Sequence, residues 1–163
     1  GLDLLLHLAG DVQSVQAYKD VRAHENIEVE DTCVAAVRYH NGALGVIQAT
    51  TSVHPDVQQR IELHGSEGTI ILEGTEDVWI KHWETFNNGA REIENRTPIE
   101  HSGAAAVLKE GGEAHRRQIK DFVDAVLADR EPSVNGAEGR RSLEVVRAIY
   151  ASAEMAQEVL LDG

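Results

Sequence analysis

The chain has 163 residues, of which 42% are hydrophobic and 26% charged, and its formal net charge is −13. This length and composition predict one globular domain over residues 1–163 that folds without a disulfide or a metal. The acidic excess argues against a nucleic-acid partner, and the lack of any run of 18 apolar residues argues against a membrane span.

The first predicted element is a helix over residues 2–9, with Gly10 as its C-terminal stop. The segment has no basic region typical of a signal peptide. It begins without methionine or a capping residue, so we expect the natural chain to start further upstream. A strand over residues 12–18 follows.

Residues 31–51 carry the clearest local pattern, because Asn41-Gly42 separates two alternating runs and is typical of a hairpin. A two-residue turn predicts four strand pairs, which are Tyr39 with Leu44, Val37 with Val46, Ala36 with Ile47, and Val34 with Ala49. Both faces of this hairpin would be partly apolar. We therefore expect self-association through the sheet, as a dimer or tetramer.

Further strands are predicted over residues 57–63, 69–72, 77–83 and 91–96. The segment 64–68 is expected to turn on the positive φ of its glycines. Residues 97–112 show no period and predict a loop. Apolar residues then recur with helical spacing over 119–127 and 143–153, with Gly136 and Gly139 in the connection. This order predicts an α+β fold, an open antiparallel-rich sheet with helices packed on one face.

Cys33 is the single cysteine and lies in a strand-like run, so we expect an unreactive structural thiol in a reducing cytoplasm. The sequence contains no Gly-x-Gly-x-x-Gly, no Walker loop, no Cys-x-x-Cys and no His-Glu-x-x-His. We therefore expect no cofactor-binding residue and no metal site within this chain.

Together these segments resemble the C-terminal domain of the glucose–fructose oxidoreductase / inositol dehydrogenase / rhizopine-catabolism (Gfo/Idh/MocA) family over nearly the whole chain. The residues that carry the resemblance are Gly1-Leu2-Asp3-Leu4-Leu5, Glu30-Asp31-Thr32 with Asn41-Gly42, Gly65-Ser66-Glu67-Gly68-Thr69-Ile70, His115-x-x-Gln118-x-x-Asp121-Phe122-Val123-Asp124-Ala125, Pro132-x-x-x-Gly136, and Ser142-Leu143-Glu144-Val145-Val146 with Ala148-Ile149-Tyr150-Ala151-Ser152-Ala153.

The resemblance implies a parent enzyme with an N-terminal Rossmann domain that binds NAD or NADP and carries the catalytic lysine. This chain, which lacks that domain, would shape the site for a sugar, a polyol or a related small molecule. The family's catalytic histidine would fall just before Gly1. Asp3 would orient that histidine, or it is a solvated residue that suits a first helical turn. His115 would lie near the substrate cleft, or it has a structural partner.

Three other side chains have weaker candidate roles. His7 lies one turn after Asp3, but two ligands make no metal site, so structural packing is favoured. Trp79 and Trp83 are expected on one strand face, as core or interface anchors rather than a sugar platform. An alternative for the whole chain is a free-standing, non-catalytic binding or assembly module of the same fold. The sequence upstream of Gly1 would separate these hypotheses.

Overall fold

The computed structural model describes residues 1–55, 57–74, 78–87, 90–95 and 104–161. The chain divides into two compact units, each of which is described by itself. The terminal unit combines Leu2–Val57 with Gly136–Gly163, and the middle unit holds Gln58–Asn135 together with Gly1. The strand pairs described in both units are antiparallel, and helices accompany them. The expected α+β class is therefore confirmed, with the strands divided between two sheets.

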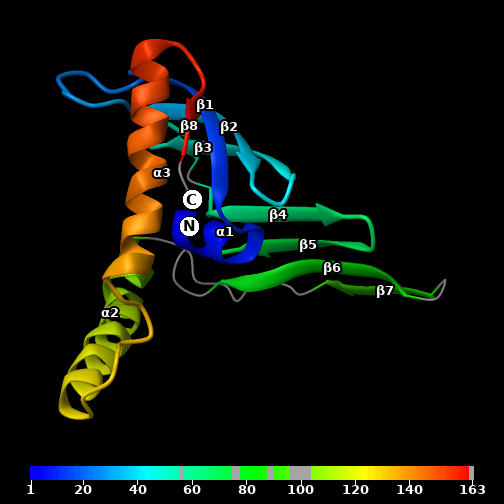
Figure 1. Ribbon diagram of the computed structural model, residues 1–163, viewed down its shortest axis with the longest axis vertical. Coiled ribbons are helices and arrows are strands. Elements are labelled where there is room, and N and C mark those ends of the chain that lie inside the picture. The colour runs from blue at the N-terminus through cyan, green and yellow to red at the C-terminus, as the bar shows by residue number, and fades with distance from the viewer. Residues whose placement is uncertain (56, 75–77, 88–89, 96–103, 162–163) are drawn as a thin grey trace. The chain divides into compact units, whose positions relative to one another are not determined.

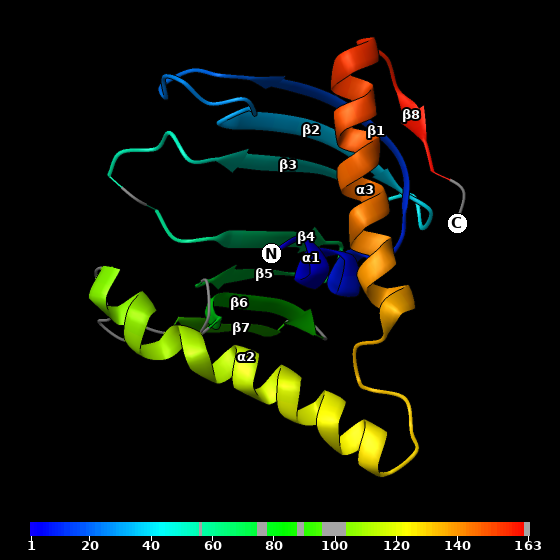
Figure 2. The same cartoon turned by 90° about the vertical axis from the view of Figure 1, so that its left-hand side faces the viewer.

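The terminal unit is a four-stranded sheet with two helices. Its elements are α1 (Leu2–Ala9), β1 (Val12–Asp20), β2 (Thr32–Tyr39), β3 (Leu44–Thr50), α3 (Gly136–Met155) and β8 (Val159–Leu160), and the strand order is β3-β2-β1-β8. Helix α3 packs on β1 and also contacts α1 (Figures 1 and 2).

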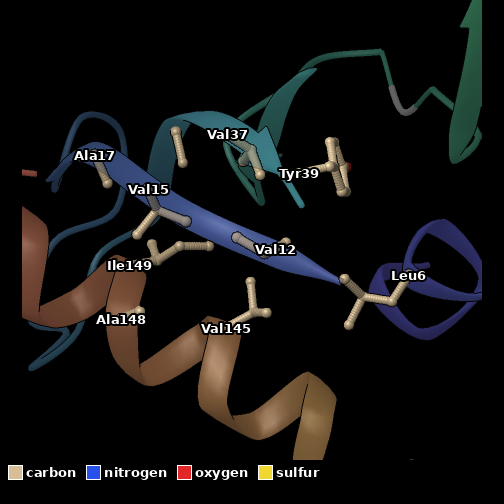
Figure 3. Packing of buried hydrophobic residues seen from close by; sticks show 10 residues of the cluster. Leu6, Val12, Val15, Ala17, Val37, Tyr39, Val145, Ala148 and Ile149 are labelled. Atoms are coloured by element: carbon tan, nitrogen blue, oxygen red, sulfur yellow. The ribbon is translucent and has the colours of Figure 1, made fainter. Parts of the chain in front are cut away.

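The core of this unit lies between α3 and the inner face of the sheet (Figure 3). Val145, Ala148 and Ile149 recur at helical spacing and form one apolar side of α3. They face inward residues of β1, among them Val15, which is 1% exposed. The remaining members of this cluster are Leu6, Val12, Ala17, Ala35, Val37 and Tyr39.

The predicted hairpin exists, but its predicted register is wrong by one residue. Val37 pairs with Gly45 and Ala36 with Val46, because the turn contains three residues rather than two. The backbone N–H of Tyr39 donates to the carbonyl of Ala43 at 2.9 Å, and Gly42 has a φ of 88°. A three-residue turn that ends in a left-handed residue is a common hairpin connection.

The register decides which side chains face away from α3, because a one-residue slip reverses every side chain. Val37 is buried, whereas Val46 is 73% exposed on the opposite face. That opposite face, which we call the outer face, also carries the exposed side chains of Tyr18, Val34 and Leu44.

The middle unit contains a second sheet, in the order β4-β5-β6-β7. Its strands are β4 (Arg60–Gly65), β5 (Gly68–Glu73), β6 (Trp79–Asn87) and β7 (Ala90–Asn95). The predicted pairing of the last two strands is confirmed, while part of their turn lies outside the described residues.

The glycines of the turn between β4 and β5 do not have the positive φ that we expected. Gly65 pairs with Gly68 across Ser66 and Glu67. Gly68 is instead required by a close approach of strands, since a Cβ there would lie 2.3 Å from the carbonyl oxygen of Glu84.

The helices extend further than the sequence predicted. Helix α2 spans Ala104–Leu127, so the expected loop is wrong from residue 104 onward, and residues 97–103 lie outside the described part of the chain. The three alanines that open α2 are strong helix formers, which explains the earlier start. Gly136 and Gly139 belong to α3 rather than to the connection before it.

Both long helices end in a left-handed residue that is not glycine. Asp129 (φ 50°) follows α2, and Ala156 (φ 54°) follows α3. After α2, the N–H of Arg130 donates to the carbonyl of Ala125 at 3.0 Å, as in a Schellman cap. Among the described residues, no helix is both long and apolar enough to cross a membrane.

Candidate functional site

Asp3 lies in the first turn of α1, where a carboxylate is favoured by the helix dipole. The helix ends as expected, since Gly10 has a φ of 93° and its N–H donates to the carbonyl of Leu6 at 2.9 Å. Leu6 is buried in the core, whereas Asp3 is exposed. Burial of Leu6 therefore fixes the position of the helix, while the Asp3 side chain stays accessible to solvent.

The first half of α3 makes polar contacts near both ends of α1. The Ser142 hydroxyl donates a hydrogen bond to Oδ1 of Asp3. One residue earlier, the Arg141 guanidinium donates to Oδ1 of Asp11 from Nη2 at 2.6 Å and from Nε at 2.9 Å. These bonds to Asp11, with a further one to Glu138, raise the pKa of Arg141. Sequence reasoning missed Ser142, because its partner lies 139 residues away.

His7 and His115 are both exposed. His7 shares α1 with Asp3, but the described residues contain no group of three or more His, Cys, Asp or Glu side chains placed to hold a metal ion. His115 lies on α2 in the middle unit, whereas Asp3 lies in the terminal unit. The suggested roles of Asp3 and His115 remain predictions.

A buried carboxylate organises the segment that joins β1 to β2. Asp31 is 2% exposed, and its two oxygens accept hydrogen bonds from the backbone N–H groups of Arg22 (2.9 Å), Ala23 (2.8 Å) and His24 (3.0 Å). Burial alone would raise the pKa of Asp31. The hydrogen bonds from these backbone groups outweigh it and hold the pKa far below its ordinary value.

The same carboxylate orients a histidine. Nδ1 of His24 lies 3.2 Å from Oδ2 of Asp31, and the imidazole side chain is 46% exposed. An ionised carboxylate can only accept hydrogen bonds, so Nδ1 of His24 must carry the proton in this contact. Nε2 does not face the carboxylate. The sequence signal for this arrangement was the Glu30-Asp31-Thr32 motif, which by itself gave no role to Asp31.

Neighbouring polar contacts fix the end of the segment. The Tyr150 hydroxyl donates to Glu30 at 2.5 Å, and this bond is the main cause of the raised pKa of Tyr150. Nζ of Lys19 lies 4.2 Å from the centre of the Tyr150 ring. Burial, followed by the charge of Glu30, raises the pKa of Cys33. Cys33 is half-buried, and a raised pKa disfavours the thiolate form that reacts.

Trp79 and Trp83 do not share a strand face, so that prediction is wrong. Trp79 pairs with Glu73 and Trp83 with Ile70, because an irregularity interrupts the register between Ile71 and Leu72. A bulge adds one residue to a strand and thereby reverses the alternation beyond it.

The chain matches known proteins along nearly its whole length. Residues 1–161 match the model of the Gfo/Idh/MocA family described as "Oxidoreductase family, C-terminal alpha/beta domain". The chain belongs to this family.

A curated relative is myo-inositol 2-dehydrogenase of Thermotoga maritima, 26% identical over 98% of this chain and 46% of its own length. Among solved structures, the WlbA dehydrogenase of Bordetella pertussis, in complex with NADH and UDP-GlcNAcA, is 29% identical with a TM-score of 0.74 over 99% of this chain and 45% of its own. Levoglucosan dehydrogenase, in complex with NADH and L-sorbose, shares the fold at 20% identity, with a TM-score of 0.72 over 99% of this chain and 48% of its own. The domain thus spans about half the length of these relatives.

Proposed function

We propose that this domain forms the substrate-binding and oligomerisation half of an NAD(P)-dependent oxidoreductase acting on a sugar, a polyol or a related hydroxy or keto metabolite. The observation that carries the proposal is the family match over residues 1–161. Its support includes the 29% identical WlbA dehydrogenase, whose structure contains NADH and a nucleotide sugar acid.

The dinucleotide belongs to a domain upstream of this one. The sequence has no Gly-x-Gly-x-x-Gly, and its Gly65-to-Gly68 turn joins two strands rather than opening a helix, so these residues do not fit a dinucleotide. When bound in the upstream domain, the nicotinamide supplies the hydride chemistry. This domain contributes binding and orientation of the hydroxyl-bearing substrate.

Within that division, Asp3 acts beside the reacting centre. Its exposed carboxylate, fixed near the start of α1, accepts a hydrogen bond from a histidine that precedes Gly1 and sets the orientation of that imidazole. His115 hydrogen-bonds a substrate hydroxyl. Both assignments rest on the positions that these residues hold in the family's motifs.

Calorimetry with NADH and NADPH tests whether the dinucleotide binds to this domain or to the upstream one. We expect no heat of binding to the 163-residue chain and stoichiometric binding to the full-length protein. Binding of either dinucleotide by the short chain would contradict the proposal. So would an upstream sequence without a dinucleotide-binding βαβ unit, an outcome that favours the free-standing assembly module. A screen of full-length enzyme with cyclic polyols, hexoses and nucleotide sugar acids then identifies the substrate.

Self-association through the outer face of the first sheet completes the proposal. Apolar side chains gathered on the face opposite the core favour coverage by a partner, since single domains rarely expose large apolar patches. Tyr18 pairs with Val34, and Ala36 with Val46, so these side chains adjoin on that face. A second copy can present the same surface in a symmetric dimer.

Sedimentation of two charge substitutions tests this interface. Val46→Glu places a charge in the outer face and should convert an oligomer to monomer. Val57→Glu is the matched control, because Val57 is also 73% exposed but lies outside the strands of the sheet. Self-association through the outer face would be contradicted by a monomeric unmodified protein or by equal effects of both substitutions.

A further inference from the structure

We propose that Ser142 is a positioning residue that holds the Asp3 carboxylate in the orientation required by the reaction. This inference rests on the proposed function, because the orientation of Asp3 affects turnover only if an active site forms beside α1. The Ser142 hydroxyl donates to Oδ1 of Asp3 across 139 residues of sequence. Both residues belong to the terminal unit.

The contact suits positioning because it fixes an otherwise exposed side chain. Asp3 is exposed, whereas Ser142 is half-buried on a helix packed against the core strand β1. A solvent-exposed aspartate without a partner exchanges between rotamers. The bond to Ser142 engages Oδ1, and a carboxylate keeps further acceptor capacity on its other oxygen. That oxygen, Oδ2, can accept from an imidazole N–H.

The position of α1 itself depends on other residues. Leu6 is buried in the core, and Arg141 binds Asp11 just beyond the C-terminal end of the helix. Loss of the Ser142 hydroxyl should therefore free the Asp3 side chain without displacing α1. This separation allows the carboxylate's orientation to be tested apart from the fold.

NMR of the 163-residue chain tests positioning without any substrate. Three-bond couplings to Cγ of Asp3 should report a single χ1 rotamer in the unmodified chain and in Ser142→Thr, which keeps a hydroxyl, and averaged rotamers in Ser142→Ala. Arg140→Ala is a matched control on the same turn of α3, since Arg140 pairs with Glu144 instead. Averaged couplings in the unmodified chain, or a fixed rotamer in Ser142→Ala, would overturn the inference.

Kinetics of the full-length enzyme test the consequence, with the substrate found in the screen. Ser142→Ala should lower kcat by about tenfold while KM changes by less than about twofold, since small misplacements of a reacting group reduce turnover strongly. Ser142→Thr should restore kcat. Asp3→Asn should lower kcat at least as much, and adding Ser142→Ala to it should have no further effect.

The outcomes separate the two proposals. If Asp3→Asn impairs kcat but Ser142→Ala does not, the positioning role is wrong and the role of Asp3 stands. If Asp3→Asn leaves kcat unchanged, the proposed role of Asp3 is itself wrong. Equal losses in Ser142→Ala and Ser142→Thr would show a packing effect and overturn the inference.

Discussion

The Ser152 hydroxyl accepts a hydrogen bond from the backbone N–H of Ala17 at 3.0 Å. On this side of β1, strand β8 pairs only with Ser14 and Val15, so the helix side chain replaces the strand partner that Ala17 lacks. The same hydroxyl donates to the carbonyl of Gln157 at 2.6 Å. Ser152, with 0% exposure, thus satisfies two backbone groups at once.

Ser152→Ala should lower the free energy of unfolding by about 1–3 kcal/mol, because it leaves the buried N–H of Ala17 without an acceptor. Urea unfolding followed by circular dichroism measures this change. Ser66→Ala, in the exposed turn of the second sheet, is the control and should be neutral. A neutral Ser152→Ala would mean that water replaces the hydroxyl.

Asp31→Asn should destabilise the segment between β1 and β2, since an amide cannot present two acceptor oxygens to the N–H groups of Arg22, Ala23 and His24. Protection of these amides from hydrogen exchange should fall. Glu25→Gln, an exposed change in the same segment, should preserve it. Unchanged protection in Asp31→Asn would contradict the role of the carboxylate.

The depressed pKa of Asp31 also fixes the sign of a pH dependence. A carboxyl that is harder to protonate in the folded state contributes stability that is complete above its unfolded pKa, near 3.8, and is lost as pH falls below it. The stability gap between the unmodified chain and Asp31→Asn should therefore be constant above about pH 5 and narrow below about pH 4. Urea midpoints across this range measure the gap, and a gap that widens in acid would contradict the sign.

Gly68→Ala should destabilise the second sheet by about 1–3 kcal/mol, the usual effect of forcing atoms into a packed site. The added Cβ would lie 2.3 Å from the carbonyl oxygen of Glu84, so β5 and β6 must separate. Gly65→Ala is the matched control, because its Cβ would meet its nearest neighbour at 3.6 Å. Thermal unfolding compares the two, and equal losses would show that turn flexibility, not contact, requires glycine.

Ala156→Gly should stabilise the protein by about 0.5–1 kcal/mol, because glycine avoids the steric penalty that alanine experiences at a φ of 54°. Ala151→Gly, inside α3, should destabilise by about 1 kcal/mol and serves as the opposite control. The same thermal unfolding measurement reports both. A loss of stability in Ala156→Gly would contradict the left-handed cap.

Local patterns predicted most helices and strands, since apolar spacing and turn residues are encoded over a few positions. The helix ending at Gly10 and the hairpin at Asn41 are examples. The register of that hairpin was not predictable, because Asn41-Gly42 is compatible with turns of two or three residues. The register change opposite Trp79 and Trp83 arises from pairing between strands, which their spacing does not encode.

The candidate site was predicted less completely than the fold. Asp3 was found through its helix motif, but Ser142 and Asp31 gain their roles from partners that only the folded chain brings close. A serine inside a helix and an aspartate before a strand are common residues in common places. Their sequence neighbours therefore carry no sign of what they bind.

The terminal unit is discontinuous, and this has a consequence for biosynthesis. Ala17 and Ser152 are 135 residues apart, so the inner face of β1 meets α3 only after the whole middle unit has been made. During synthesis, the apolar inner face of β1 to β3 is therefore exposed to solvent until the middle unit and α3 have left the ribosome. Nascent chains halted before Gly136 are thus expected to recruit chaperones, and this dependence should end once α3 has left the exit tunnel.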